Sequence, residues 1–259
     1  MAELVDAVRA IAAEAGALAL RRAGEGFKRW DKTPGNPVSE VDLELDALLR
    51  ARLSALLPDA GWLSEETADN ADRLACERVW VVDPIDGTRD FVRGRSGWAV
   101  SIGLAERGQV VLGVLDAPAI GHRWWAAAGA GSWRGDTRLR CATRTDFSGA
   151  RVPTDSLPRE DSDLVAVPKP NSIALRIAMV AGGEADLVAT LRWGYEWDVA
   201  AAALIATEAG AAVSDAFGVP LAFNTARAQA FGVLASAPGI HSAAVERLAD
   251  RARLLGVTP

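Results

Sequence analysis

The stretch Val79-Trp80-Val81-Val82-Asp83-Pro84-Ile85-Asp86-Gly87-Thr88 decides how this sequence is interpreted. Its first four residues are apolar and β-branched or aromatic, which predicts a short buried strand that stops at Asp83-Pro84. Pro84 fixes one backbone angle and lacks an N–H donor, while Gly87 permits a tight turn. Such a turn can direct two carboxylates and a main-chain carbonyl to one point, and hard divalent cations prefer these oxygen ligands. The stretch therefore predicts a strand that ends in a cation site, although a bare pair of aspartates would more often be a solvated turn.

Two other acidic positions stand beside apolar segments. Glu65-Glu66 follows the apolar pair in Gly61-Trp62-Leu63-Ser64, and its simpler interpretation is a charge pair at the start of a helix. Asp198 opens the most apolar helical pattern of the chain, which continues through residues 200–205. An acid on the first turn of a helix is a normal partner for the helix dipole. On so apolar a helix it is expected to be buried, and a buried carboxylate needs a cation or donors.

The rest of the chain alternates between helical and strand patterns. Apolar residues recur at helical spacing over residues 4–19, 45–56, 172–180, 198–209 and 241–255. Ser39 and Asp42 have the spacing of a capping box before the second of these helices. Residues 98–106 and 110–116 predict a hairpin, whereas 28–37 and most of 143–170 are expected to be irregular or loop-rich. Helices at both ends and strands between them predict a layered α+β fold, one domain over 1–259 with halves 1–140 and 141–259.

Composition excludes several classes of protein. The chain has 259 residues, with 28 Lys and Arg against 34 Asp and Glu, which gives a net charge of -6. This balance argues against a nucleic-acid partner, because such binding needs clustered basic residues. Cys76 and Cys141 are too few for a disulfide framework or a thiolate zinc site. Charged residues interrupt the N-terminal apolar pattern and no long apolar run follows, so we expect a soluble, cytoplasmic protein without a membrane partner.

The acidic motifs together resemble those of the inositol monophosphatase family. They are Glu65-Glu66, Asp83-Pro84-Ile85-Asp86-Gly87-Thr88, Trp197-Asp198-Val199-Ala200-Ala201 and Glu208-Ala209-Gly210. Members of that family are metal-dependent, lithium-sensitive phosphatases that share a fold with fructose bisphosphatase, and homodimers are common among them. The resemblance runs from about Lys32 to Asn224. It implies a layered α-β-α-β-α sandwich and a small phosphorylated metabolite as substrate.

The resemblance also implies a metal-ligand set. Glu65, Asp83 and the Ile85 carbonyl would hold one Mg²⁺, and Asp83, Asp86 and Asp198 would hold a second. Glu66 would lie near a weaker third ion. Mn²⁺ would suit the same oxygen ligands. Carboxylates gathered in this way repel one another unless cations neutralise them, so the ions would also explain how an acidic protein binds a phosphate.

The catalytic and substrate contacts follow from the same resemblance. Two ions activate a water and stabilise the leaving oxygen. Thr88 would pair with Asp42 and, together with the metal-holding Glu65, orient the attacking water. The N–H groups of Gly87 and Thr88 would grip the phosphate. Lys32 would sit at the mouth of the site.

The choice of phosphate ester depends on the residues before Asp198. Inositol-specific members have an acid there that accepts hydrogen bonds from sugar hydroxyls, but residues 190–195 contain no carboxylate and the first acid is Glu196. This difference favours a resemblance to the CysQ-like 3'(2'),5'-bisphosphate nucleotidases, which convert phosphoadenosine phosphate to AMP. In that interpretation Glu196 contacts substrate and Lys169 and Arg192 bind a second phosphate. Tyr195 or Trp193 stacks on adenine.

Three alternatives stay open. Inositol-1-monophosphatase activity is the first, and histidinol-phosphatase activity is the second, because Arg89-Asp90-Phe91 also occurs in histidinol-phosphatase-like relatives. The third belongs to a different class, a non-catalytic partner of the transcription or ribosome-assembly machinery. A partner of that kind would present a basic or exposed apolar docking surface, against which the net acidity weighs.

Overall fold

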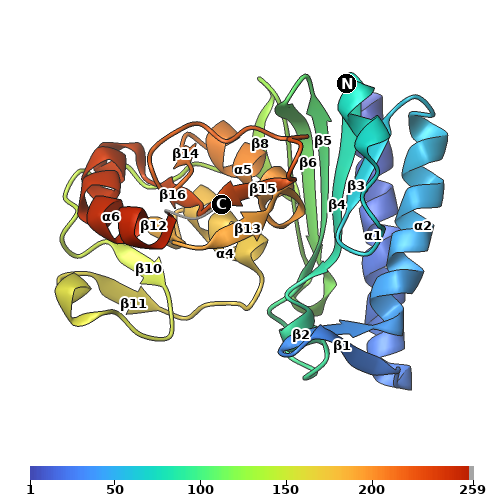
Figure 1. The fold of residues 1–259 in the computed structure, drawn as a ribbon, viewed down its shortest axis with the longest axis horizontal. Helices are drawn as coiled ribbons and strands as arrows, with labels where there is room; N and C mark the ends of the chain where they lie inside the picture. The colour runs from blue at the N-terminus through green and yellow to red at the C-terminus, as the bar shows by residue number, and fades with distance from the viewer. Residues whose placement is uncertain (257–259) are drawn as a thin grey trace.

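Helices and sheets follow one another in five layers across the molecule (Figure 1). The computed structural model describes residues 1–256. The outer helical layer holds α1 (Ala2–Glu25) and α2 (Glu40–Leu56), and a seven-stranded sheet lies beneath it. Next come α4 (Ile173–Ala181) and α5 (Glu196–Glu208), then a three-stranded sheet and α6 (His241–Gly256). The predicted α-β-α-β-α sandwich is therefore confirmed.

The large sheet is built entirely from residues before 140. Its strands pair antiparallel, except for the parallel pair of the first two. In order across the sheet they are β3 (Gly61–Ser64), β4 (Arg78–Asp86), β5 (Ala99–Glu106), β6 (Gln109–Ala117), β7 (His122–Ala127), β8 (Gly131–Arg134) and β9 (Thr137–Arg138). The hairpin expected around residue 108 is the β5–β6 pair.

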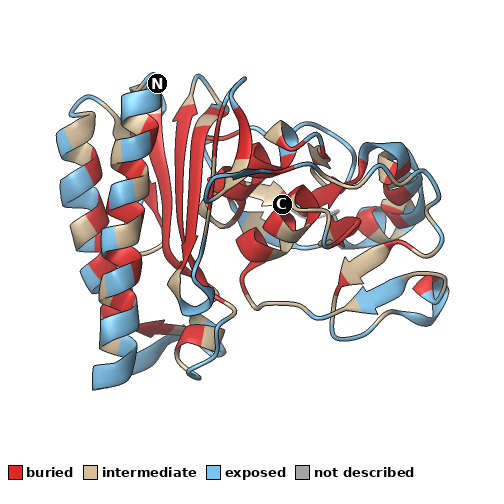
Figure 2. Ribbon diagram, turned by 180° about the vertical axis from the view of Figure 1, so that it is seen from behind, coloured by how far each residue is buried: buried red, intermediate tan, exposed pale blue. Residues whose placement is uncertain are grey.

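Two helices cover one face of this sheet with the apolar stripes that the sequence predicted. The buried positions recur every three or four residues, as an amphipathic helix requires, and they are Val5, Val8, Ile11, Ala12, Ala15 and Ala19 of α1 and Val41, Leu45, Leu49 and Leu53 of α2. Figure 2 shows these buried stripes turned toward the buried strands. The predicted capping box is present, since Ser39 Oγ and the Ser39 N–H both donate to Asp42 Oδ2.

Helix α5 covers the opposite face and approaches the strands closely. Ala200 to Ala203 are all buried, and these small side chains allow a close approach to the sheet. A side chain at Gly113 would put its Cβ 2.6 Å from the Ala201 carbonyl oxygen. Small residues on both elements thus let the helix backbone lie against β6. This contact fixes the start of α5, which carries Asp198, relative to the sheet.

Seven strands after residue 150 form small sheets. The three-stranded sheet has the order β12-β16-β14, and two-stranded pairs join β10 with β11 and β13 with β15. Their bounds are β10 (Arg151–Pro153), β11 (Val165–Val167), β12 (Leu187–Ala189), β13 (Trp193–Tyr195), β14 (Ala212–Ser214), β15 (Gln229–Phe231) and β16 (Leu234–Ser236). Among residues 1–256, no helix combines the length and apolar character needed to cross a bilayer.

Two local expectations are wrong. Residues 28–37 are not irregular: β1 (Arg29–Thr33) and β2 (Asn36–Ser39) pair antiparallel around the turn at Pro34-Gly35. The strand at Val79 does not stop at Asp83-Pro84 but continues to Asp86. In both places proline misled the interpretation, because proline is tolerated at strand edges and at bulges.

Candidate active site

The end of β4 carries an irregularity that places two aspartates together. Asp83 pairs with Ser101 and Asp86 with Ala99, so three steps along β4 match two steps along β5. In a regular strand, residues three apart point to opposite faces. The extra residue is a β-bulge, which cancels this alternation. Asp83 and Asp86 can therefore face the same space.

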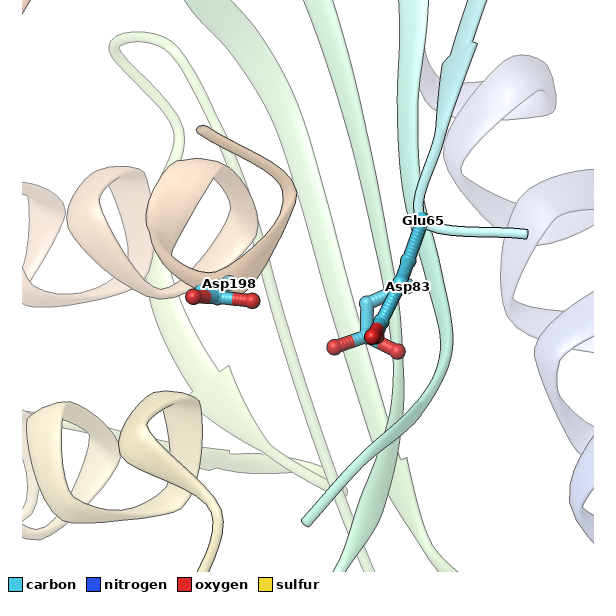
Figure 3. Close-up of side chains that lie close together, drawn as sticks. All are labelled: Glu65, Asp83 and Asp198. Atoms are coloured by element: carbon cyan, nitrogen blue, oxygen red, sulfur yellow. The ribbon is translucent and has the colours of Figure 1, made fainter. Parts of the chain in front are cut away.

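Three carboxylates from separate elements meet at this point. Glu65 follows β3, Asp83 lies on β4, and Asp198 lies in the first turn of α5. One oxygen of each lies within 4.8 Å of one oxygen of each of the others. Figure 3 shows Asp198 reaching from the helix toward the two acids of the sheet. The ligand positions predicted for Glu65, Asp83 and Asp198 are thus brought together.

Asp86 lies beside this group and also anchors α4. Its Oδ2 accepts hydrogen bonds from Ser172 Oγ at 2.5 Å and from the Ala174 N–H at 2.7 Å. The Ile173 N–H is 3.4 Å from Oδ1. The start of α4 therefore orients Asp86 and leaves Oδ1 the freer oxygen. Ser172 was missed by the sequence reasoning, because only its position before a helix was visible, not its contact with an acid 86 residues away.

These acids have strongly perturbed ionisation. Burial raises the pKa of Asp83 well above its usual range, and the charges of Glu65, Asp86 and Asp198 raise it further. Burial also raises the pKa of Asp198 well above its usual range, and it raises that of Asp86 to about 6. Within residues 1–256, no Lys or Arg forms an ion pair with Asp83, Asp86 or Asp198. Buried carboxylates without a protein cation fit a divalent metal.

The second pair of predicted residues adjoins this cluster. Thr88 begins α3 (Thr88–Phe91), and its Oγ1 lies 3.3 Å from Asp42 Oδ1 and 3.0 Å from the Ile85 carbonyl oxygen. Because Asp42 Oδ2 is occupied by Ser39, Oδ1 is the oxygen that faces Thr88. Burial raises the pKa of Asp42 to about 6. Gly87 precedes the helix with a φ of 95°, which favours glycine, and a Cβ there would lie 2.7 Å from the Gly97 carbonyl oxygen.

Lys32 and Glu66 form a separate group beside Glu65. Lys32 Nζ lies 2.7 Å from Glu66 Oε1 and 3.3 Å from Glu65 Oε1. The Glu66 carboxylate is buried, which raises its pKa to about 7 against the opposing effect of Lys32. Neither Lys32 nor Glu66 lines the pocket described next. The structure thus places Lys32 as the partner of two acids, one of which, Glu65, lines that pocket.

The acidic cluster lines a pocket of about 610 Å³. Basic and aromatic side chains from the second half of the chain and α3 line the same pocket: Arg89, Lys169, Arg176, Arg192, Trp193 and Tyr195. Arg192 is exposed, and its guanidinium has no hydrogen bond or ion pair among residues 1–256. Trp193 and Tyr195 are 37% and 45% exposed. A phosphate ester that enters would meet both carboxylates and cations.

Glu196 is not part of this pocket, which corrects the prediction that it contacts substrate. Its side chain is only 1% exposed. The carboxylate accepts hydrogen bonds from the N–H groups of Asn224 and Thr225 and from Thr225 Oγ1. Because these bonds occupy both oxygens, Glu196 fastens the 224–225 loop to the start of α5. Side chains alternate along the extended chain before the helix, so Tyr195 faces the pocket and Glu196 does not.

Replacing Glu196 by alanine tests this correction. We expect a loss of about 2–3 kcal/mol in the free energy of unfolding, because two buried N–H groups lose their acceptor. We expect kcat and KM to change by less than about twofold in the folded fraction. Urea unfolding of the variant and steady-state kinetics measure the two effects. A large rise in KM with an unchanged free energy of unfolding would instead support a contact between Glu196 and the substrate.

The raised pKa values give the stabilisation by Mg²⁺ a defined pH dependence. Asp42 and Asp86 have pKa values of about 6 and Glu66 about 7, against 3.8 and 4.5 in an unfolded chain. Between the unfolded-state and folded-state pKa values, the folded protein binds more protons than the unfolded chain. The free energy of unfolding of the metal-free protein therefore decreases as pH rises through about 6 to 7. Mg²⁺ binds the ionised carboxylates and removes this loss. We expect the difference in Tm between Mg²⁺ and EDTA to widen by several degrees, roughly 5 °C, from pH 5.5 to 7.5. A difference that stays constant or narrows would contradict the assignment.

A family model described as the inositol monophosphatase family matches residues 1–253. The chain belongs to the inositol monophosphatase family. It is 37% identical to a Mycobacterium tuberculosis protein named inositol-1-monophosphatase SuhB, across 100% of this chain and 92% of the relative. It is 30% identical to the 3'(2'),5'-bisphosphate nucleotidase CysQ of Escherichia coli, across 85% and 94%. The solved structure of a Thermotoga maritima IMPase superposes with a TM-score of 0.83 at 26% identity, over 99% of this chain and 100% of that one.

Membership in the inositol monophosphatase family makes this chain a metal-dependent phosphatase. The family acts on small phosphorylated substrates, and the acidic cluster is where such an enzyme would hold its metal. The alternative of a non-catalytic partner protein is not needed to explain any feature of this pocket. The relatives carry two different substrate names, so they do not choose the ester.

Proposed function

We propose that this protein is a Mg²⁺-dependent phosphomonoesterase for a small substrate with a second anionic group. A 3'(2'),5'-bisphosphate nucleotide such as phosphoadenosine phosphate fits best, with AMP as the product. The supporting observation is the pocket itself, whose lining combines the acidic cluster with Lys169 and Arg192. A substrate with one phosphate at the acids and a second at these cations uses both.

The acidic wall would hold the ions. Glu65, Asp83 and the Ile85 carbonyl suit one Mg²⁺, and Asp83, Asp86 and Asp198 suit a second, with Glu66 near a weaker third. When bound, Mg²⁺ or Mn²⁺ lowers the pKa of water and neutralises the charge that develops on the transferred phosphoryl group and the leaving oxygen. Since Asp83 belongs to both sets, its loss should affect both ions.

The chain's own groups complete the reaction. Thr88 Oγ1 would accept a proton from the attacking water while its own proton passes to Asp42 Oδ1, which lies 3.3 Å away. The N–H groups of Gly87 and Thr88 have no acceptor in the described part of the chain, so they can bind the oxygens of the scissile phosphate. Protonation of the leaving hydroxyl needs only solvent, because the pocket is open.

The cationic and aromatic residues of the pocket distinguish among the candidate esters. Inositol 1-phosphate presents neutral hydroxyls, which need acceptors. Glu196, the first carboxylate after residue 190, is not available, because it accepts hydrogen bonds from the N–H groups of Asn224 and Thr225. Histidinol phosphate is cationic at its far end and would meet Arg192. A nucleotide bisphosphate presents a phosphate to Arg192 and Lys169 and a base to Trp193 or Tyr195. Tyr195 already stacks on Trp197, with 4.3 Å between ring centroids, so its ring is held flat for a further partner.

A substrate panel tests the proposal. We would measure kcat/KM with Mg²⁺ for phosphoadenosine phosphate, inositol 1-phosphate, histidinol phosphate and fructose bisphosphate. The bisphosphate nucleotide should give the highest value, and Arg192→Gln should lower that value about tenfold while leaving inositol 1-phosphate within about twofold. Arg21→Gln, an exposed site on α1, controls for the change in net charge. A clear preference for inositol 1-phosphate would favour the activity named for the mycobacterial relative instead.

Three wider properties are proposed on the family resemblance alone. They are inhibition by lithium, assembly into a homodimer and a cytoplasmic location. Assays with lithium chloride test the first property, and light scattering tests the second.

A further inference from the structure

A second cavity, of about 980 Å³, adjoins the candidate active site. It lies between the β1–β2 hairpin, the α3 turn and the segment around Lys169, at the end of the sheet where the hairpin appears in Figure 1. Gly35, Pro37 and Lys169 are among the residues that line both cavities. The two spaces therefore adjoin each other. No residue of the family ligand set lines this groove, and Lys169 is the one proposed substrate contact that does.

The groove is positively charged although the protein is acidic. Its lining carries four cationic side chains and two carboxylates, which leaves a local charge of +2 in a chain of net charge -6. The cationic residues are Arg29, Arg89, Arg93 and Lys169, and the acidic ones are Asp31 and Asp155. Such a local reversal of sign attracts anions.

The protein itself leaves much of this positive charge unpaired. Lys169 pairs with Asp155 at 2.6 Å. Arg29 and Arg89 each donate to a main-chain carbonyl, of Val92 and Gly35 respectively, which orients the guanidinium without neutralising it. Arg93 is exposed and has no side-chain hydrogen bond or ion pair among residues 1–256.

The fixed arginines suit a particular kind of anion. Arginine binds phosphate oxygens with two parallel N–H donors. Because the groove has more cations than carboxylates, such donors stay available. Trp30 is 45% exposed at the groove wall and offers an apolar ring face beside the charges. A volume of this size accommodates a small molecule rather than a folded partner. We propose that this groove, lined by Arg29, Arg89 and Arg93, is a second phosphate-binding site that takes a phosphorylated small molecule.

Two sources could supply that phosphate, and both use the same chemistry. It could be the second phosphate of the substrate, held by Lys169 and the groove arginines instead of by Lys169 and Arg192, and in that form the inference rests on the proposed function. It could equally be a separate phosphate or pyrophosphate ion that binds beside the substrate.

Binding of inorganic pyrophosphate to the metal-free protein is the first test. In EDTA no metal remains to hold an anion at the acids, so calorimetry of the full chain reports cationic side chains, and the arginine variants assign the binding to the groove. We expect saturable binding that weakens as salt is raised. Arg93→Gln should weaken it about fivefold and Arg29→Gln/Arg93→Gln further, whereas Arg95→Gln should leave it unchanged. Arg95 is the matched control because it is an exposed arginine two residues away that does not line the groove. No pyrophosphate binding, or equal binding by Arg93→Gln and the wild type, would overturn the proposal.

Kinetics then separate the two sources. If the groove takes a distal phosphate, Arg93→Gln raises KM about fivefold for a bisphosphate substrate and leaves KM for inositol 1-phosphate unchanged. If a separate ion binds, both KM values stay unchanged, and pyrophosphate alters the wild-type rate but not that of Arg93→Gln. Because the binding experiment needs no turnover, a protein that binds pyrophosphate but hydrolyses none of the esters would refute the proposed function and leave the groove standing.

Discussion

Replacing Asp83 by asparagine should reduce turnover by at least about 10³-fold while making the metal-free protein more stable. The loss follows because Asp83 is the one side chain proposed to contact both ions, and each ion stabilises charge in the transition state. The gain follows because the 2% exposed Asp83 carboxylate is buried next to three other acids, which raises its pKa well above the usual range. Asparagine keeps an oxygen for the Ile85 N–H, which now donates to Asp83 Oδ1 at 2.9 Å, and removes the charge.

Three measurements check this expectation. Phosphate release with Mg²⁺ gives the turnover, calorimetry gives Mg²⁺ affinity, and thermal unfolding in EDTA gives the stability. We expect a metal-free Tm higher by roughly 3 °C or more. Asp116→Asn is the matched control, because Asp116 is equally buried on the same sheet but pairs with Arg123 at 2.7 Å and packs against α1 at Gly16. A folded Asp83→Asn protein with near-normal activity would end the ligand assignment, and so would an equal loss in Asp116→Asn.

Replacing Thr88 by alanine should lower kcat about 100-fold and change KM little. The proposed role of Thr88 Oγ1 is to orient the attacking water and pass a proton to Asp42, an interaction that matters mainly in the transition state. Substrate binding should persist, because the main-chain N–H of residue 88 does not depend on the side chain.

Serine at position 88 separates this role from a structural one. Thr88→Ser keeps the hydroxyl 3.3 Å from Asp42 and should recover most of kcat. If alanine and serine are equally slow, the methyl group and not the proton path is what matters. If alanine is as fast as the wild type, Thr88 has no part in the chemistry.

Local sequence patterns predicted the five long helices and the strands β4, β5 and β6, but not most of the short strands. Apolar spacing gave α1 and α2, and the Ser39–Asp42 spacing gave the capping box that starts α2. These features depend on residues three or four apart, whose relative positions are set by the helix itself. The β1–β2 hairpin was missed because it contains Pro34 and Pro37, and prolines usually mark loops.

The candidate site was only partly visible in the sequence. Its acids stood out because each one stands beside an apolar segment, and the family resemblance assigned them to one cluster before any geometry was known. The same approach gave Glu196 the wrong role and left Ser172 unnoticed. The direction of the Glu196 side chain and the reach of Ser172 depend on contacts with residues 224–225 and with Asp86, which no local pattern encodes.

The sequence by itself determined which residues are acidic, which elements carry them and which family they belong to. Only the tertiary structure decided where they point. The β-bulge between Asp83 and Asp86 turns two aspartates to one face. The close contact of Ala201 with Gly113 holds Asp198 opposite them, across more than 100 residues of chain. The groove beside Arg93 likewise exists only after folding, because its cations come from three separate segments. Side-chain chemistry is a local property of the chain, whereas convergence of charges is a property of packing, which long-range contacts set.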